Sequence, residues 1–209
     1  WLHREIANSR AYQSSAATNA TNRLDRRNFS HARIRRLPAE VIYDALRLAT
    51  ASEAGAKARR NDIRARAVGS LATRWTRPTQ EAYSLAIFGK PSRELTCDCD
   101  RSTSPSLLQT IYLRNDPEVL ALVDRADGWV AEVKAAEKRS AGAHREGQDR
   151  PPDRRALVRE AYLRTLSRVP EPDELDRALA SLDEDTSAAK GVGRLLWALV
   201  NTKEFIVNH

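Results

Sequence analysis

The stretch "SPSLLQTIYLRNDPEVLALVDR", residues 104–125, decides the fold class. It contains two places where a serine or an aspartate stands directly before a proline, at Ser104–Pro105 and at Asp116–Pro117. An N-cap side chain followed by a proline in the first turn is a frequent beginning of an α-helix. Apolar residues then recur every three or four positions, as one face of a helix requires. The stretch therefore predicts two consecutive helices.

Similar signals occur along most of the chain. Glycine and proline are sparse, at 8 and 9 of 209 residues, and alternating β-branched residues, which favour strands, are almost absent. We therefore expect an all-α protein, an irregular multi-helix bundle with a C-terminal helical hairpin. Further helices are expected at 38–49 after Pro38, at 128–139 after Asp127, at 154–168 after Asp153, from Pro172 onward, and within 191–207.

The polar stretch "SAGAHREGQDRPPD" divides the predicted organisation into three parts. Residues 1–139 form a helical domain, 140–153 a linker, and 154–209 the C-terminal hairpin, packing on or beside the first domain. Residues 50–80, rich in alanine and arginine, are expected to form a surface helix and a long loop. Trp197 is expected to dock the last helix because "LLWALV" at 195–200 is strongly apolar. The other predicted core positions of the hairpin are Leu157, Ala161, Leu175, Leu179, Leu182, Leu196, Leu199 and Phe205.

On the helix after Pro38, two adjacent apolar rows are expected to share the packing. They are Val41, Ala45 and Leu48, with Ile42, Leu46 and Ala49 beside them.

Charge is uneven along the chain. Residues 1–101 carry 19 Lys+Arg against 10 Asp+Glu, and residues 102–209 carry 16 against 18. A basic half can attract a polyanion such as nucleic acid or acidic polysaccharide, or it can simply solvate helices with arginine. In "RRNFSHARIRR", residues 26–36, Arg33 and Arg36 would share a helical face and could line a polyanion groove or a solvated surface. Asp183, Glu184 and Asp185 are expected to form a solvated turn.

Several function classes lack their usual signals. The longest apolar run, at 195–200, is far below the ~20 residues of a membrane span. Any targeting segment would lie upstream of Trp1. We find no nucleophile elbow, no phosphate-binding glycine loop and no Cys-x-x-Cys-His, so no cofactor is expected in this chain.

The chain's two cysteines, Cys97 and Cys99, lie in "TCDCDR" at 96–101. Three interpretations stay open. They can form a strained mutual disulfide; they can hold a metal together with Asp98, Asp100 or a distant histidine; or they can be two ordinary reduced cysteines. The histidines, His3, His31, His144 and His209, are widely separated and make no metal-binding spacing.

Five motifs in order resemble one known family. They are "WLHREIANSRAYQSS" (1–15), "NFSHARIRRLPAEVIYDAL" (28–46), "YSLAIFGKPSRELTCDCDRSTSPSLLQTIYLRND" (83–116), "AYLRTLSRVPEPDEL" (161–175) and "LLWALVNTKEFIVNH" (195–209). Together they resemble the planctomycete-specific C-terminal domain of unknown function that follows cytochrome-c-like domains. Near the cysteines the sequence departs from the family's usual wording at Leu95, Thr96, Asp100, Thr103 and Ser104.

The resemblance implies an exported, extracytoplasmic protein, periplasmic or at the cell surface, with haem c in an upstream domain, and it thereby favours the Cys97–Cys99 disulfide. The resulting expectation is an accessory binding or assembly domain of a larger exported cytochrome-like protein, with the upstream domains of the same polypeptide as partners. One alternative is an enzyme domain with its site at the cysteine loop, where the helix beginning near Ser104 offers free N–H groups to an anion. The other is polyanion binding by the basic N-terminal half. The candidate functional loop consists of Arg93, Glu94, Cys97, Asp98, Cys99, Asp100, Arg101 and Gln109.

Overall fold

The computed structural model describes residues 1–67, 80–90, 107–142 and 152–208. Within these ranges the chain is all-α, as predicted, and its β-structure is limited to isolated bridges such as Arg36–Val207. The chain divides into two compact units. The smaller unit comprises Trp1–Leu37 and Ile206–His209, and the larger unit comprises Pro38–Phe205.

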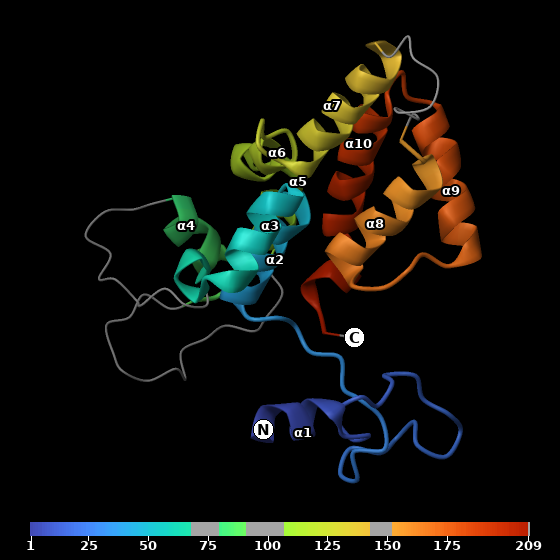
Figure 1. The fold of residues 1–209 in the computed structure, drawn as a ribbon. Helices are drawn as coiled ribbons and strands as arrows, with labels where there is room; N and C mark the ends of the chain where they lie inside the picture. The colour runs from blue at the N-terminus through green and yellow to red at the C-terminus, as the bar shows by residue number, and fades with distance from the viewer. Residues whose placement is uncertain (68–79, 91–106, 143–151, 209) are drawn as a thin grey trace. The chain divides into compact units, whose positions relative to one another are not determined.

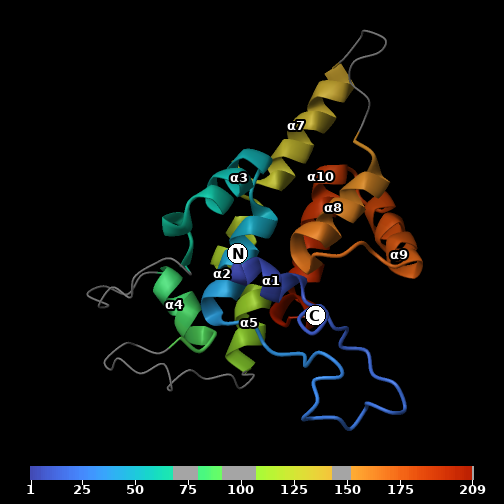
Figure 2. The same ribbon diagram turned by 60° about the horizontal axis from the view of Figure 1, so that its bottom comes forward.

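The larger unit is a bundle of short helices built around α10 (Figure 1). Helix α10 packs against α6, α7, α8 and α9, whereas α2 contacts α4, α6 and α8. Figure 2 shows α8, α9 and α10 gathered on one side and α2, α4 and α5 on the other. The bounds are α2 Ala39–Thr50, α3 Glu53–Asn61, α4 Gln80–Ile87, α5 Leu107–Asn115, α6 Pro117–Val123, α7 Trp129–Gly142, α8 Arg154–Leu166, α9 Pro172–Asp183 and α10 Ala188–Val200, with 3₁₀ turns at Ile63–Ala65 and Glu204–Ile206.

Helix α7 ends at Gly142, inside the predicted 140–153 linker, whose residues 143–151 lie outside the described ranges. Helices from both sides of that linker, α7 and α8, pack on α10 within the larger unit.

The predicted helix starts are confirmed where the structure describes them. The Asp116 carboxylate accepts the Glu118 N–H at 2.9 Å and opens α6, with Pro117 as its first residue. Asp153 accepts the Arg155 N–H at 2.9 Å and opens α8. Pro172 begins α9, and α3 is a mostly exposed helix, as expected for residues 50–80. The Ser104 cap lies outside the described residues.

The packed faces differ in part from the predicted ones. On α2, Ile42, Leu46 and Ala49 are buried, whereas the neighbouring row at Val41, Ala45 and Leu48 is only half-buried. Among the predicted hairpin core, Leu157, Leu175 and Leu179 are half-buried and the other five are buried.

The docking role predicted for Trp197 is wrong, because its side chain is 38% exposed. Helix α10 docks instead through Val192, Leu196, Leu199 and Val200, which follow one another at helical spacing.

One local prediction is wrong, and the solvated turn predicted at 183–185 holds for Asp183 and Glu184, which are exposed, but not for Asp185. Residues 26–36 contain no helix, so Arg33 and Arg36 do not share a helical face. The cause is Asp25, whose carboxylate accepts the N–H groups of Arg27 and Asn28 at 2.9 Å each and so competes with helix formation. Asp185 is not part of a solvated turn, because its side chain is only 7% exposed and lies 2.8 Å from Arg194.

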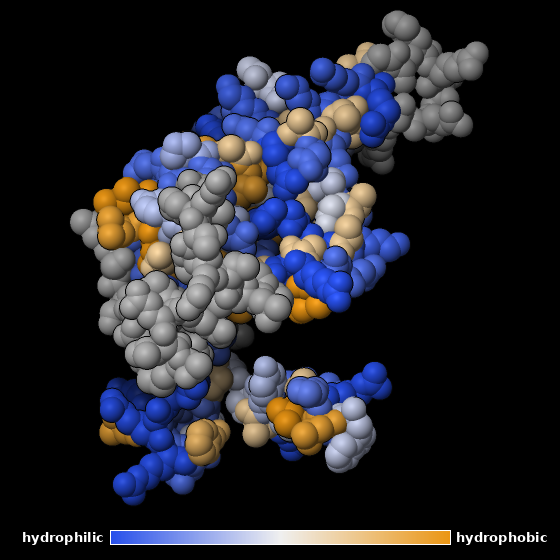
Figure 3. Space-filling model, turned by 90° about the vertical axis from the view of Figure 1, so that its left-hand side faces the viewer, coloured by the Kyte–Doolittle hydropathy of each residue, from blue (hydrophilic) through white to orange (hydrophobic). Residues whose placement is uncertain are grey.

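The smaller unit joins segments from both ends of the described chain. The Leu37 N–H donates to the Ile206 carbonyl and the Asn208 N–H to the Arg35 carbonyl, each at 2.9 Å. Helix α1, Leu2–Asn8, has no buried residue. At the bottom of Figure 3, hydrophobic and hydrophilic residues of this unit lie side by side at the surface. No residue of 1–37 belongs to the buried hydrophobic core, so this segment has little core of its own.

No helix in the described part of the chain is long and apolar enough to cross a membrane.

Candidate functional site: a groove beside α10

The predicted cysteine loop lies almost entirely outside the described residues. This applies to Arg93, Glu94, Cys97, Asp98, Cys99, Asp100 and Arg101. Gln109 is described, and it is buried on α5, where its Nε2 atom donates to the Ile87 carbonyl at 3.0 Å. Gln109 therefore fastens the last turn of α4 to α5. The disulfide, the metal site and the enzyme site at this loop stay predictions.

A buried polar cluster links α2, α4, α5 and α6. The Glu118 carboxylate accepts hydrogen bonds from Tyr43 at 3.2 Å and Ser84 at 2.8 Å, and the Tyr112 hydroxyl lies 2.9 Å from it. Burial raises the pKa of Tyr43 to about 12 and that of Tyr112 further still. Both phenols therefore stay protonated and act as hydrogen-bond donors, so the cluster has the chemistry of a structural tie. The sequence analysis missed it, because its members are far apart in the chain.

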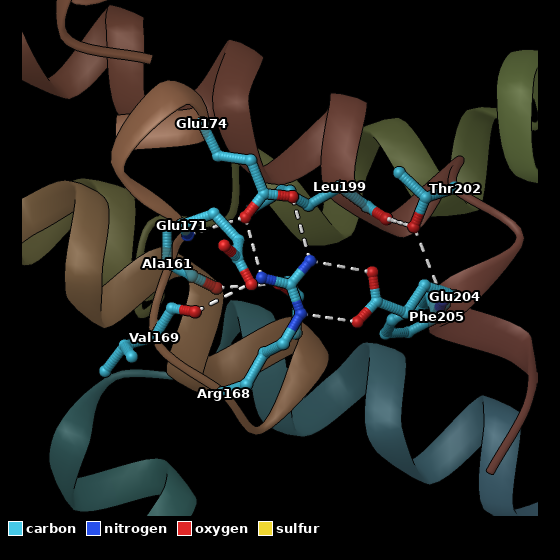
Figure 4. Close-up of polar contacts among 10 residues, drawn as sticks. Ala161, Arg168, Val169, Glu171, Glu174, Leu199, Thr202, Glu204 and Phe205 are labelled. Carbon is cyan, nitrogen blue, oxygen red and sulfur yellow. Dashed lines mark hydrogen bonds and ion pairs between the residues drawn. The ribbon is translucent and has the colours of Figure 1, made fainter. Parts of the chain in front are cut away.

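A second cluster surrounds Arg168, just after α8 (Figure 4). Its guanidinium forms two hydrogen bonds to Glu174, at 2.7 and 2.8 Å, and two to Glu204, at 2.6 and 2.9 Å. These bonds lower the pKa of Glu174 to about 2 and raise that of Arg168 above its usual value. The cluster connects α9 to the turn after α10, and thereby joins two of the motifs quoted above, 161–175 and 195–209. Its donors and acceptors form hydrogen bonds with one another, so we interpret the cluster as a contact that stabilises the fold.

A groove of about 510 Å³ lies between α6, α7 and α10. This volume lies within the range of ~300–1,000 Å³ that is usual for binding sites. We call it the α10 groove. Its lining consists of Leu120, Val123, Asp124, Val130, Lys134, Ser187, Ala189, Lys190, Gly193, Arg194 and Trp197.

The register of α10 decides which of its residues line the α10 groove. Lys190, Gly193, Arg194 and Trp197 follow one another at i, i+3, i+4 and i+7, and so share the face turned away from the packed one. A Cβ atom added at Gly193 would lie 3.7 Å from a methyl group of Val123 and 3.9 Å from those of Val130, so there is room for one methyl group at ordinary contact distance. Trp197 and Leu120 line it while 38% and 44% exposed.

The rim is basic. In the described ranges, the ammonium groups of Lys134 and Lys190 form no ion pair, and Arg194 is paired with Asp185. Asp124 supplies a carboxylate to the lining. An apolar floor below two unpaired lysines suits a partner that is apolar in the middle and acidic at its edge.

Glu137 holds the two long walls of the groove together. Its carboxylate, on α7, accepts the N–H groups of Ala188 and Ala189 at the first turn of α10, the latter at 3.2 Å. A carboxylate at a helix N-terminus satisfies free amides and interacts favourably with the helix dipole. This contact fixes one end of the groove and makes it a rigid feature of the larger unit.

The described residues contain no group of three or more His, Cys, Asp or Glu side chains that could hold a metal ion. The lining of the α10 groove is mainly apolar and cationic, with the single carboxylate of Asp124. The Ser187 hydroxyl accepts the Lys190 N–H at 3.2 Å as the N-cap of α10. These groups are suited to binding.

A protein-family model described as "Protein of unknown function (DUF1553)", PSD1, matches residues 1–182. The matched region includes α6 and α7 and ends before α10. No curated protein and no solved structure matches the chain.

Proposed function

Because the chain belongs to the PSD1 family of proteins of unknown function (DUF1553), we propose its role from its own surface: an accessory binding domain that holds an acidic, amphipathic helix of a partner polypeptide in the α10 groove. The observation that carries the proposal is the open stripe of α10, where Gly193 and Trp197 form an apolar floor below unpaired lysines. A helix whose opposite face is fully packed offers this stripe to a partner.

The dimensions of the groove favour a helix as the occupant. Ser187 to Trp197 comprises eleven residues of α10 and its cap, and the ten steps between them, at 1.5 Å each, span about 15 Å. That length accommodates two to three turns of a partner helix, which would bury side chains at i, i+3 or i+4, and i+7. Gly193 allows close approach, because it places no side chain between the partner and the walls.

The charges of the rim favour an acidic occupant. Lys134 on α7 and Lys190 on α10 lie on the two walls, so carboxylates on the flanks of a bound helix would meet a cation on either side. Such rim charges set orientation and association rate, whereas the apolar floor supplies most of the affinity.

The partner we propose is an upstream domain of the same polypeptide. The resemblance to the planctomycete-specific domain supports this, because it implies a larger, exported, cytochrome-like protein with haem c upstream. In this proposal the larger unit is an assembly element outside the cytoplasm. An absorption spectrum and cell fractionation of the longer natural polypeptide test the context, since a haem-free or cytoplasmic protein would contradict it.

The groove itself is tested with a synthetic probe. The probe is a fluorescein-labelled helical peptide with leucines along one face and glutamates on both flanks, and its partner probe carries lysine in place of each glutamate. We expect fluorescence anisotropy to show binding of the acidic peptide only. Gly193→Leu, which fills the groove, should abolish binding, and a Lys134→Gln, Lys190→Gln double variant should weaken it.

Lys57→Gln is the matched control, because Lys57 is an exposed lysine on α3 outside the groove. It should leave the affinity unchanged. The proposed function would be refuted if the acidic and basic peptides bound equally well. It would also be refuted if Gly193→Leu bound the acidic peptide as tightly as the unmodified chain does. If dodecanoate displaces the peptide and binds more tightly, the groove is a site for a small amphiphile and the polypeptide partner is wrong.

A further inference from the structure

The smaller unit contains a second hollow, of about 440 Å³, formed within a single stretch of chain. It lies between the loop after α1 and the segment that follows Asp25. Its lining consists of Ala16, Thr18, Arg23, Asp25, Arg26, His31, Ala32, Arg33 and Ile34. We call it the arginine hollow.

Asp25 builds the turn that shapes the arginine hollow. Its Oδ1 atom accepts the N–H groups of Arg27 and Asn28, and its Oδ2 atom accepts both the N–H of Ser30, at 3.2 Å, and its hydroxyl, at 2.5 Å. These hydrogen bonds, led by the one from the Ser30 hydroxyl, hold the pKa of Asp25 far below its usual value. The Asp25 oxygens are thus occupied by the turn itself.

One arginine of the hollow, Arg33, is held in place, and none of the three is neutralised. The Arg33 Nη2 atom donates to the Arg26 carbonyl at 2.7 Å, which positions its guanidinium over the turn. In the part of the chain that the structure describes, no carboxylate forms an ion pair with Arg23, Arg26 or Arg33. The lining therefore contains three arginines and one carboxylate, and that carboxylate is already engaged.

His31 adds an unsatisfied polar atom to the same lining. Its Nδ1 atom is shielded from solvent and has no hydrogen-bond partner among the described residues. A buried polar atom without a partner is unfavourable, so a bound ligand that supplied the missing hydrogen bond would be favoured.

We propose that the arginine hollow binds a sulfate group of an acidic polysaccharide. Planar guanidinium groups form paired hydrogen bonds to oxyanions, and unpaired arginines recover on binding the interaction they lack in the free protein. The lining contains no phenylalanine, tyrosine or tryptophan on which a nucleobase would stack. This favours a polysaccharide over a single-stranded nucleic acid, and the site is separate from the α10 groove.

The test compares two double variants with the same change in net charge. Arg26→Gln, Arg33→Gln alters the hollow, and Arg4→Gln, Arg10→Gln alters two exposed arginines of the same unit outside it. Binding of heparin, a sulfated polysaccharide, is measured by calorimetry at several salt concentrations. We expect the first variant to lose about tenfold or more in affinity and roughly 2 units of the salt slope, and the second to lose much less.

Three further results complete the experiment. Arg33→Lys should restore the charge but only part of the affinity, because lysine lacks the planar fork. Gly193→Leu in the α10 groove should leave heparin binding unchanged, so that this site and the proposed function can fail separately. Equal losses in the two double variants would overturn the site, and tighter binding of a single-stranded oligonucleotide than of heparin would overturn the polysaccharide.

Discussion

Two glycines of α10, two positions apart, are predicted to respond in opposite ways to alanine. At Gly191 an added Cβ would lie 2.9 Å from the Leu182 Cγ atom and 3.3 Å from its Cα atom, where α10 crosses α9. At Gly193 it would lie 3.7 Å from Val123 and 3.9 Å from Val130, which are ordinary contact distances. The crossing of α9 and α10 therefore depends on Gly191, whereas Gly193 leaves space.

The expected magnitudes follow from two opposing effects. Replacing a glycine inside a helix with alanine stabilises the helix by about 1 kcal/mol, and this gain applies to both positions. Forcing an extra methyl group into a packed contact costs about 1–3 kcal/mol, and this cost applies only at Gly191. Gly193→Ala should therefore raise the free energy of unfolding by about 1 kcal/mol. The free energy of unfolding of Gly191→Ala should lie about 1–3 kcal/mol below that of Gly193→Ala.

Urea denaturation followed by circular dichroism at 222 nm measures both variants against the unmodified chain. For a chain of this size, 1 kcal/mol corresponds to roughly 2–4 °C in Tm, so thermal melts provide a second reading. A Gly191→Ala variant as stable as Gly193→Ala would refute the close crossing of α9 and α10. A Gly193→Ala variant less stable than the unmodified chain would show that the groove wall is tighter than described.

Stability should also depend on pH through Glu174, whose pKa lies at about 2 instead of 4.5. The folded carboxyl binds a proton less readily than the unfolded one, so it stabilises the fold above about pH 4.5, and this contribution is lost as the pH falls through about 2. Solvent screening of this part-exposed pair limits the contribution to about 1 kcal/mol at neutral pH. Arg168→Gln should flatten this part of the stability curve, and an unchanged curve would contradict the pairing. Gln109→Leu should cost about 1–3 kcal/mol in urea denaturation, because it leaves a carbonyl at the end of α4 without its donor, and a neutral result would show that water replaces the amide. Alkylation of the unreduced, denatured protein should add no label to Cys97 and Cys99, whereas two labelled thiols in the mass spectrum would exclude their disulfide.

Helix starts could be predicted from the sequence because their causes are local. Asp116 and Asp153 cap amides two residues away, so the signal and the structure lie in the same few positions. The same locality misled the prediction at 26–36, where Asp25 uses its short reach to close a turn instead of a helix. A capping side chain predicts that nearby backbone N–H groups will be hydrogen-bonded to it. The residues that follow decide whether a helix or a turn results.

The α10 groove could not be predicted, because it depends on which face of α10 the other helices cover. Leu196 and Trp197 are adjacent and both apolar, and the sequence offers no local reason to bury one rather than the other. The choice is made by α8 and α9, which pack on the row that contains Leu196. The sequence nevertheless contains one indication. Gly193 and Lys190 lie one and two turns before Trp197 on the same row of the helix, and a row with a glycine and a lysine is poorly suited to a hydrophobic core.

The pairing of Leu37 with Ile206 has a consequence for the order in which the protein is made. On the ribosome the arginine-rich segment 1–37 emerges before the larger unit, yet its hydrogen-bonding partner is synthesised only after the whole of residues 38–205. At synthesis rates of about 5–20 residues per second, the segment waits roughly 10–30 s for that partner. Helix α10, around which the larger unit is built, is synthesised only at the end of this interval. Once α10 has packed, residues 38 and 205 hold fixed positions, which shortens the loop that must still close. The smaller unit is thus completed after the larger one, although residues 1–37 are translated before it.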